Sequence, residues 1–126
     1  MSKKEECVMK IVIGGCRTFK EYDVFCAFVN DCLEELQGGE ELTFLSGHCA
    51  GVDLMAERYA QERGLALEIF PANWAKYGRA AGPIRNREMV KRADVVIAFW
   101  DGASRGTKSL IGYAKECGKA LYIKRI

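Results

Sequence analysis

Apolar residues along this chain occur either in short runs or at a helical period, and the two patterns alternate. Between Lys20 and Gln37 they recur every three or four positions, which places them on one face of an α-helix. Gly38 and Gly39 follow directly and favour the end of that helix. In contrast, Val95–Trp100 is apolar at every position, as expected of a strand buried on both faces.

The same two patterns predict five strands that alternate with four helices. Such alternation favours a parallel sheet with helices on both faces. We therefore expect an α/β fold, a Rossmann-like doubly wound sheet of five mainly parallel strands in the order 3-2-1-4-5. The predicted strands are Val8–Ile13, Leu42–Leu45, Leu67–Phe70, Val95–Trp100 and Ala120–Ile123, and the predicted helices are Lys20–Gln37, Ala50–Arg63, Ile84–Arg92 and Gly106–Cys117.

The length of 126 residues suits one domain with its own core. Because no repeat or linker interrupts the pattern, we expect a single domain over residues 8–126 after a charged tail at residues 1–7. The longest apolar run, Val95–Trp100, is too short to cross a membrane, and no secretion signal opens the chain. We therefore expect a cytoplasmic protein without a membrane partner.

Charge and cysteine content narrow the classes of partner. The 19 basic and 17 acidic residues leave a formal charge of +2 with no long run of one sign, so a nucleic-acid partner is not expected. The six cysteines include no Cys-x-x-Cys pair, which argues against structural zinc and disulfides, and we expect no metal. A zinc ion at Cys16, His48 and Cys49, or a reversible Cys16–Cys49 disulfide, is the alternative for these turn residues.

Three predicted strands end in glycine-rich turns that lead into helices, at residues 14–18, 46–53 and 101–107. Glycine lets a ligand approach the backbone closely, and the free N–H groups of a helix start favour an anion. Three such turns at one edge of a sheet predict a phosphorylated ligand. None of them fits the P-loop or the Gly-x-Gly-x-x-Gly fingerprint, so neither a P-loop NTPase nor an ordinary NAD-dependent dehydrogenase is expected.

The segment 71–83 is irregular and rich in glycine and aromatic residues, and we expect it to close over the ligand. Arg17 and Arg85 are expected to pair with phosphate, although a surface salt bridge is the alternative for each. Trp74 is expected to stack on a base or to cover the sheet edge. Asp53 is expected to bind a ribose hydroxyl or to stabilise its helix start.

These arguments define a set of ligand-binding residues and three candidate catalytic carboxylates. The candidate carboxylates are Glu88, Asp53 and Asp101. The expected ligand-binding residues are Gly14, Gly15, Cys16, Arg17, Thr18, Ser46, Gly47, Gly51, Asp53, Trp74, Arg85, Asn86, Asp101, Gly102, Ser104, Gly106 and Thr107.

Six motifs in this order resemble those of the YspA-like, YpsA-related branch of the SLOG superfamily. The resemblance extends from about Lys10 to Ile123 and implies a Rossmann-like fold that binds a nucleotide or a nucleotide derivative without an obligatory cofactor. It also implies self-association into a homo-oligomer. The motifs are Gly15–Phe19, Ser46-Gly47 with Gly51–Asp53, Phe70–Trp74, Tyr77-Gly78, Ala81–Met89, and Ala98–Gly102 through Gly106-Thr107.

Other SLOG relatives suggest further activities. LOG phosphoribohydrolases cleave the N-glycosidic bond of a nucleotide, and Arg85 is similar to their arginine, but their glutamate would fall at Leu110. Relatives of DNA-processing protein A suggest single-stranded nucleic-acid binding. The chain also departs from the branch at Cys16, where serine is common, and at His48 and Cys49, where glycine and alanine are common.

We therefore expect a domain that binds or senses a nucleotide-like small molecule. A nucleotide N-glycosidase or phosphoribohydrolase-like enzyme that uses one of the three carboxylates is the alternative, and single-stranded nucleic-acid binding is a third hypothesis.

Overall fold

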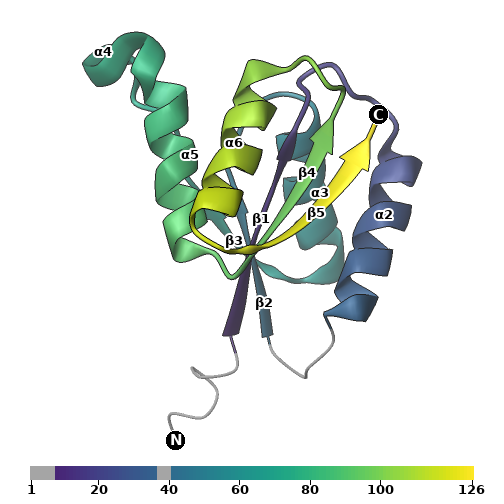
Figure 1. Ribbon diagram of the computed structural model, residues 1–126. Coiled ribbons are helices and arrows are strands. Elements are labelled where there is room, and N and C mark those ends of the chain that lie inside the picture. The colour runs from purple at the N-terminus through teal and green to yellow at the C-terminus, as the bar shows by residue number, and fades with distance from the viewer. Residues whose placement is uncertain (1–7, 37–40) are drawn as a thin grey trace, which may run out of the picture.

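The computed structural model describes residues 8–36 and 41–126, and these residues form one five-stranded sheet flanked by helices (Figure 1). All strand pairs are parallel, and the strand order β3-β2-β1-β4-β5 confirms the predicted topology. The strands are β1 (Val8–Gly15), β2 (Glu41–Ser46), β3 (Ala66–Ile69), β4 (Val95–Trp100) and β5 (Ala120–Arg125).

Helices cover both faces of the sheet (Figure 1). On one face, α2 and α3 pack their buried side chains, such as Phe25 and Tyr59, against Ile13 and Phe99 of the strands. On the other face, α5 and α6 bury residues such as Val90 against Val12 and its neighbours. The helical segments are α2 (Tyr22–Glu35), α3 (Val52–Arg63), α4 (Trp74–Tyr77), the short 3₁₀ segment η1 (Gly78–Ala80), α5 (Ala81–Arg92) and α6 (Arg105–Glu116).

Strand side chains alternate between these two cores, because successive residues of a strand point to opposite faces of the sheet. Ile11 and Ile13 of β1 belong to the core beneath α2 and α3, whereas Val12 belongs to the core beneath α5 and α6. All three side chains are fully buried. The unbroken apolar runs of the sequence are therefore explained by a sheet that is covered on both sides.

The predicted elements differ from the observed ones mainly at their ends. The helix expected from Ala50 begins at Val52, because Gly51 before it adopts φ +79°, outside the helical region. Segment 71–83, expected to be a loop, contains α4, η1 and the start of α5. The predicted tail 1–7, Cys7 and the Gly38-Gly39 helix stop lie outside the described residues. Among the residues that are described, no helix is long and apolar enough to span a membrane.

Candidate functional site

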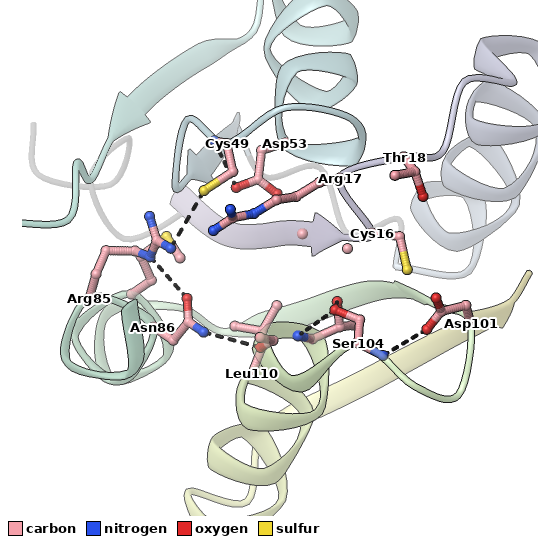
Figure 2. Close-up of a pocket in the computed structure, with 15 residues that line it drawn as sticks. Cys16, Arg17, Thr18, Cys49, Asp53, Arg85, Asn86, Asp101, Ser104 and Leu110 are labelled. Carbon is pink, nitrogen blue, oxygen red and sulfur yellow. Dashed lines mark hydrogen bonds between the residues drawn. The ribbon is translucent and has the colours of Figure 1, made fainter. Parts of the chain in front are cut away.

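A cavity of about 320 Å³ lies at the carboxyl ends of β1 and β4, at the point where the strand order reverses (Figure 2). The structure brings together here most of the residues that the glycine-rich turns predicted. Of the expected ligand-binding set, the cavity is lined by Gly14, Gly15, Cys16, Arg17, Thr18, Asp53, Arg85, Asn86, Asp101, Ser104, Gly106 and Thr107.

Close backbone packing shapes the β1 side of the cavity. A side chain at Gly15 would collide with the carbonyl oxygen of Phe99, and one at Gly51 would collide with the carbonyl oxygen of Cys16. The Val52 N–H, at the start of α3, donates to that same Cys16 oxygen at 3.3 Å. These two glycines are therefore required for the close approach of β4 and α3 to the turn after β1.

Two side chains of this turn differ in exposure and in reactivity. Arg17 is exposed and makes no hydrogen bond or ion pair with any residue that the structure describes, and it lines the cavity (Figure 2). Cys16 is buried, with 4% of its surface exposed, and burial raises the pKa of its thiol. The guanidinium of Arg17 is thus available to an anion, whereas the Cys16 thiol is protonated near neutral pH.

The start of α6 forms the opposite side of the cavity and is held by two caps. The Asp101 carboxylate accepts hydrogen bonds from the N–H groups of Ala103 and Ser104, at 2.8 Å each, and these bonds lower the pKa of Asp101. Ser104 Oγ accepts from the Thr107 N–H at 3.4 Å and lies 3.1 Å from the Thr107 hydroxyl. Asp101 is therefore an ionised carboxylate whose role is to form the turn before α6.

Two residues of α5 connect the remaining walls. Arg85 donates from Nη1 to the carbonyl oxygen of Gly47 at 2.7 Å and from Nε to Asn86 Oδ1 at 3.0 Å. Asn86 in turn donates from Nδ2 to the carbonyl oxygen of Gly106 at 3.2 Å. The pair links the turn after β2 to the start of α6, and Figure 2 shows this line of contacts along one end of the cavity.

Asp53 places a buried carboxyl group in the cavity wall, with 7% of its surface exposed. Its Oδ2 accepts a hydrogen bond from the Cys49 N–H at 3.2 Å. Burial raises the pKa of Asp53 to about 6, and the N–H of Cys49 and the positive charge of Arg85 oppose this rise only in part. A carboxyl group with a pKa in this range, facing a cavity, is a recurrent feature of functional sites.

Five of the expected ligand-binding residues do not line the cavity. Ser46 instead donates to Glu57 Oε2 at 2.8 Å, and Gly47 holds Arg85 through its carbonyl oxygen. Gly51 and Gly102 have positive φ angles of 79° and 88°, which the turns before α3 and α6 require. Trp74 is 51% exposed and lies on α4, which stands apart from the strand ends in Figure 1.

The remaining candidates on α4 and α5 also lie away from the cavity. None of the residues 71–84 lines it, so the segment expected to close over a ligand forms helical turns beside it. Glu88, a candidate catalytic carboxylate, accepts a hydrogen bond from Arg92 at 3.2 Å on the surface of α5. Of the three candidate carboxylates, Asp53 and Asp101 line the cavity and Glu88 does not.

Three lining residues are absent from the predicted set, namely Cys49, Met89 and Leu110. Met89 follows Asn86 by three positions on α5, and Leu110 follows Thr107 by three on α6, so helical spacing from the predicted residues could have found them. Leu110 stands where the resemblance to the phosphoribohydrolases would require a glutamate.

The turn after β2 contains the one non-glycine residue with a positive φ angle in the described chain, His48, at 62°. Its Nδ1 lies 2.8 Å from Glu57 Oε2, and its N–H donates to Ser46 Oγ at 3.1 Å. In the described part of the chain, no three histidine, cysteine or acidic side chains come together as a metal site. Cys16 and Cys49 are both free thiols.

Comparisons with known proteins found a family model, a phage protein and a solved structure. The family model of the YspA, cpYpsA-related SLOG family matches residues 9–77, which include the first two glycine-rich turns. The Gene 61 protein of Mycobacterium phage D29 is 32% identical over 115 residues, which cover 86% of this chain and 90% of that protein. A solved structure, the C-terminal domain of a hydrogenase from Pyrococcus furiosus, matches with a TM-score of 0.47 at 18% identity, over 92% of this chain and 91% of that one.

The length of the family match and the identity to the phage protein define the relationship. The family model covers more than half of the chain, and the phage protein aligns over most of it. The chain therefore belongs to the YspA, cpYpsA-related SLOG family, a membership that indicates a nucleotide-related, Rossmann-like domain.

Proposed function

We propose that the protein binds a phosphorylated, nucleotide-like small molecule in the cavity at the ends of β1 and β4, as a sensor or a carrier of that molecule. The observation that supports this function best is the position of Arg17. Its exposed guanidinium has no partner among the described residues and lines a cavity that also contains the start of α6. Guanidinium groups and helix starts are both suited to phosphate oxygens.

The start of α6 offers further donors to the same phosphate. The Thr107 N–H bonds to Ser104 Oγ and the Lys108 N–H to the Ser104 carbonyl oxygen. The N–H groups of Arg105 and Gly106, which precede them, have no partner among the residues that the structure describes. The first turn of α6 therefore presents two free amides beside the side chains of Ser104 and Thr107.

The apolar part of the cavity lining suits the uncharged part of a nucleotide. Met89 and Leu110 contribute apolar surface, and both are nearly fully buried, at 3% exposure. A nucleotide presents an ionised phosphate at one end and a flat, partly apolar base at the other. A cavity that combines donors with an apolar wall matches this division, as ligand pockets commonly do.

Calorimetric titration with a panel of nucleoside mono-, di- and triphosphates tests the proposal. We expect stoichiometric binding of at least one nucleotide, and Arg17→Ala to weaken it by about 10- to 100-fold, as expected for the loss of a charge-assisted hydrogen bond. Arg87→Ala is the matched control, because Arg87 is exposed on α5 and lines no described cavity. Equal affinity in the two variants, or no binding across the panel, would contradict the proposed site.

One observation favours an enzyme as the second candidate function. Asp53 is a buried carboxyl group in the cavity wall, and its pKa of about 6 suits a general acid or base near neutral pH. Hydrolysis of an N-glycosidic bond needs a carboxylate near the sugar, and Leu110 cannot serve as one. Asp53 would take this role in a nucleotide N-glycosidase.

Chromatographic detection of free base, released with time from nucleoside monophosphates, tests the enzyme. We expect Asp53→Asn to abolish release while nucleotide binding persists. Glu88→Gln is the control, because Glu88 lies outside the cavity, and we expect release to continue in that variant. Absence of release from the unmodified protein, with binding retained, would leave binding as the function.

A further inference from the structure

A second cavity of about 570 Å³ adjoins the first along the carboxyl edge of the sheet. Cys16, Thr18 and Asp101 line both cavities, so the two share one boundary at the ends of β1 and β4. In Figure 2 these three residues lie together at the end of the first cavity opposite Arg85 and Cys49. The second cavity therefore continues the first on the side away from α5.

The charged side chains of the second cavity carry a formal excess of one positive charge. Lys20, Lys124 and Arg125 line it, against the two acids Glu21 and Asp101. None of these five side chains forms an ion pair within the described residues. The excess of positive charge thus remains available to an anionic group.

Two of the five charged side chains are already engaged with backbone groups. Arg125 donates from Nη2 to the carbonyl oxygen of Asp101 at 3.1 Å, and the Asp101 carboxylate accepts from the N–H groups of Ala103 and Ser104. The two lysines have no hydrogen-bond partner among the residues described. Lys20 and Lys124 are therefore the groups that a ligand would meet first.

The second cavity also contains apolar surface beside its cations. Phe19 and Val24 line it, and the Phe19 ring lies 5.8 Å from that of Phe99, which fixes it against the core. A cation cluster beside a fixed aromatic ring suits a second phosphorylated, ring-bearing group rather than a small inorganic ion. The first cavity, at about 320 Å³, is near the lower end of the range for small-molecule sites, whereas the adjoining cavities together offer room for a larger molecule.

We propose that the ligand is two-headed: a nucleoside phosphate in the first cavity, joined through its phosphates to a second nucleoside-like group in the cavity lined by Lys20 and Lys124. The bridging phosphates pass Thr18, a residue that lines both cavities. This inference rests on the proposed nucleotide-binding function and specifies the class of ligand as a phosphate-bridged dinucleotide.

Amide chemical shifts of the ¹⁵N-labelled protein test this, with adenosine monophosphate and diadenosine diphosphate and triphosphate as probes. We expect the monophosphate to shift amides of the first cavity, such as those of Arg17 and Gly106, and to leave those of Lys20 and Lys124 unshifted. The two-headed probes are expected to shift those of Lys20 and Lys124 as well, and to bind at least ten-fold more tightly.

A double variant, Lys20→Ala with Lys124→Ala, provides a second test, because it removes the two lysines of the second cavity. We expect it to reduce the affinity for the two-headed probes to that for the monophosphate, and to leave the monophosphate affinity unchanged. Lys91→Ala with Lys115→Ala removes the same charge from exposed positions that line neither cavity, and we expect no change.

The outcomes separate this inference from the proposed function. Two-headed probes that bind no more tightly than the monophosphate, or whose affinity survives the double substitution, would overturn the two-headed ligand. Monophosphate binding with shifts at Arg17 and Gly106 would then still support the proposed function. Failure of every probe to bind would overturn both.

Discussion

Arg85 donates a hydrogen bond from Nη1 to the carbonyl oxygen of Gly47 at 2.7 Å, and this bond ties α5 to the turn after β2. The same nitrogen reaches the carbonyl oxygen of Phe70 at 3.4 Å, and Nε donates to Asn86. Only Nη2, 3.7 Å from Cys49 Sγ, retains donor capacity for a ligand. Arg85, which the sequence predicts to bind phosphate, thus also connects α5 to the turns that follow β2 and β3.

Replacement of Arg85 is therefore expected to lower stability. Arg85→Ala removes the donor to the buried Gly47 carbonyl and should reduce the free energy of unfolding by about 1–3 kcal/mol. Arg87 lies two positions further along α5 and is exposed, so Arg87→Ala should change the free energy of unfolding by about 0.5 kcal/mol or less. Urea unfolding followed by circular dichroism measures both, and equal stability of the two variants would show that the Arg85 contacts do not hold the turn.

Asp53 should make stability depend on pH. Its pKa is about 6 in the folded chain, against an ordinary value of 3.8, so the folded state holds this proton more tightly than the unfolded state. The resulting stabilisation is complete below about pH 4 and is lost as pH rises to about 6, an effect of about 3 kcal/mol.

Asp53→Asn removes this titration. The free energy of unfolding of the variant minus that of the unmodified protein should rise by about 3 kcal/mol between pH 4 and pH 7, because the other titrating groups are common to both proteins. Urea unfolding at a series of pH values provides the measurement. A constant difference over this range would mean that the carboxyl group titrates as it does in the unfolded chain.

His48 is expected to carry backbone strain, because its φ of 62° is a conformation that glycine adopts without cost. Both His48→Gly and His48→Ala lose the contact with Glu57, but only glycine relieves the strain. We expect the glycine variant to be more stable than the alanine variant by about 1 kcal/mol. Thermal unfolding of the pair measures this difference, and equal melting temperatures would refute the assignment of strain.

Gly106 and Gly112 form a matched pair on α6. A Cβ atom added at either glycine would meet no heavy atom within 4 Å from another part of the described chain, but only Gly106 lines the cavity. We expect Gly106→Val to weaken nucleotide binding by at least about ten-fold through occupation of the ligand space. Gly112→Val should leave binding unchanged, and both should alter stability to a similar, small extent. Undiminished affinity in the Gly106 variant would place the phosphate elsewhere.

Much of the fold and part of the candidate site could be predicted from the sequence, because both follow from local patterns. Apolar runs such as Val95–Trp100, alternating with helical periods, predicted the parallel sheet and its strand order. Parallel strands gather their carboxyl ends at one edge, so the turns at 14–18 and 101–107 necessarily meet there.

Element boundaries and the segment 71–83 could not be predicted equally well. Gly51 ends the turn before α3 because a side chain there would collide with the backbone at Cys16, a contact between residues distant in sequence. The segment around Trp74 has the glycine-rich and aromatic composition of a lid. In the structure, however, this segment forms α4 and η1, which lead into α5, and Trp74 does not line the cavity.

The sequence by itself thus determined the alternation of strands and helices, the order of the sheet and the edge at which a ligand is expected, since these depend on side-chain period and chain connectivity. Only the tertiary structure decided what each side chain does at that edge. Among the residues that the structure describes, Arg17 has no hydrogen-bond or ion-pair partner while Arg85 is bonded to Gly47, and Asp53 is buried while Glu88 is exposed. Such differences depend on which distant groups come within hydrogen-bonding distance and on how much water they exclude, and neither is encoded in local spacing.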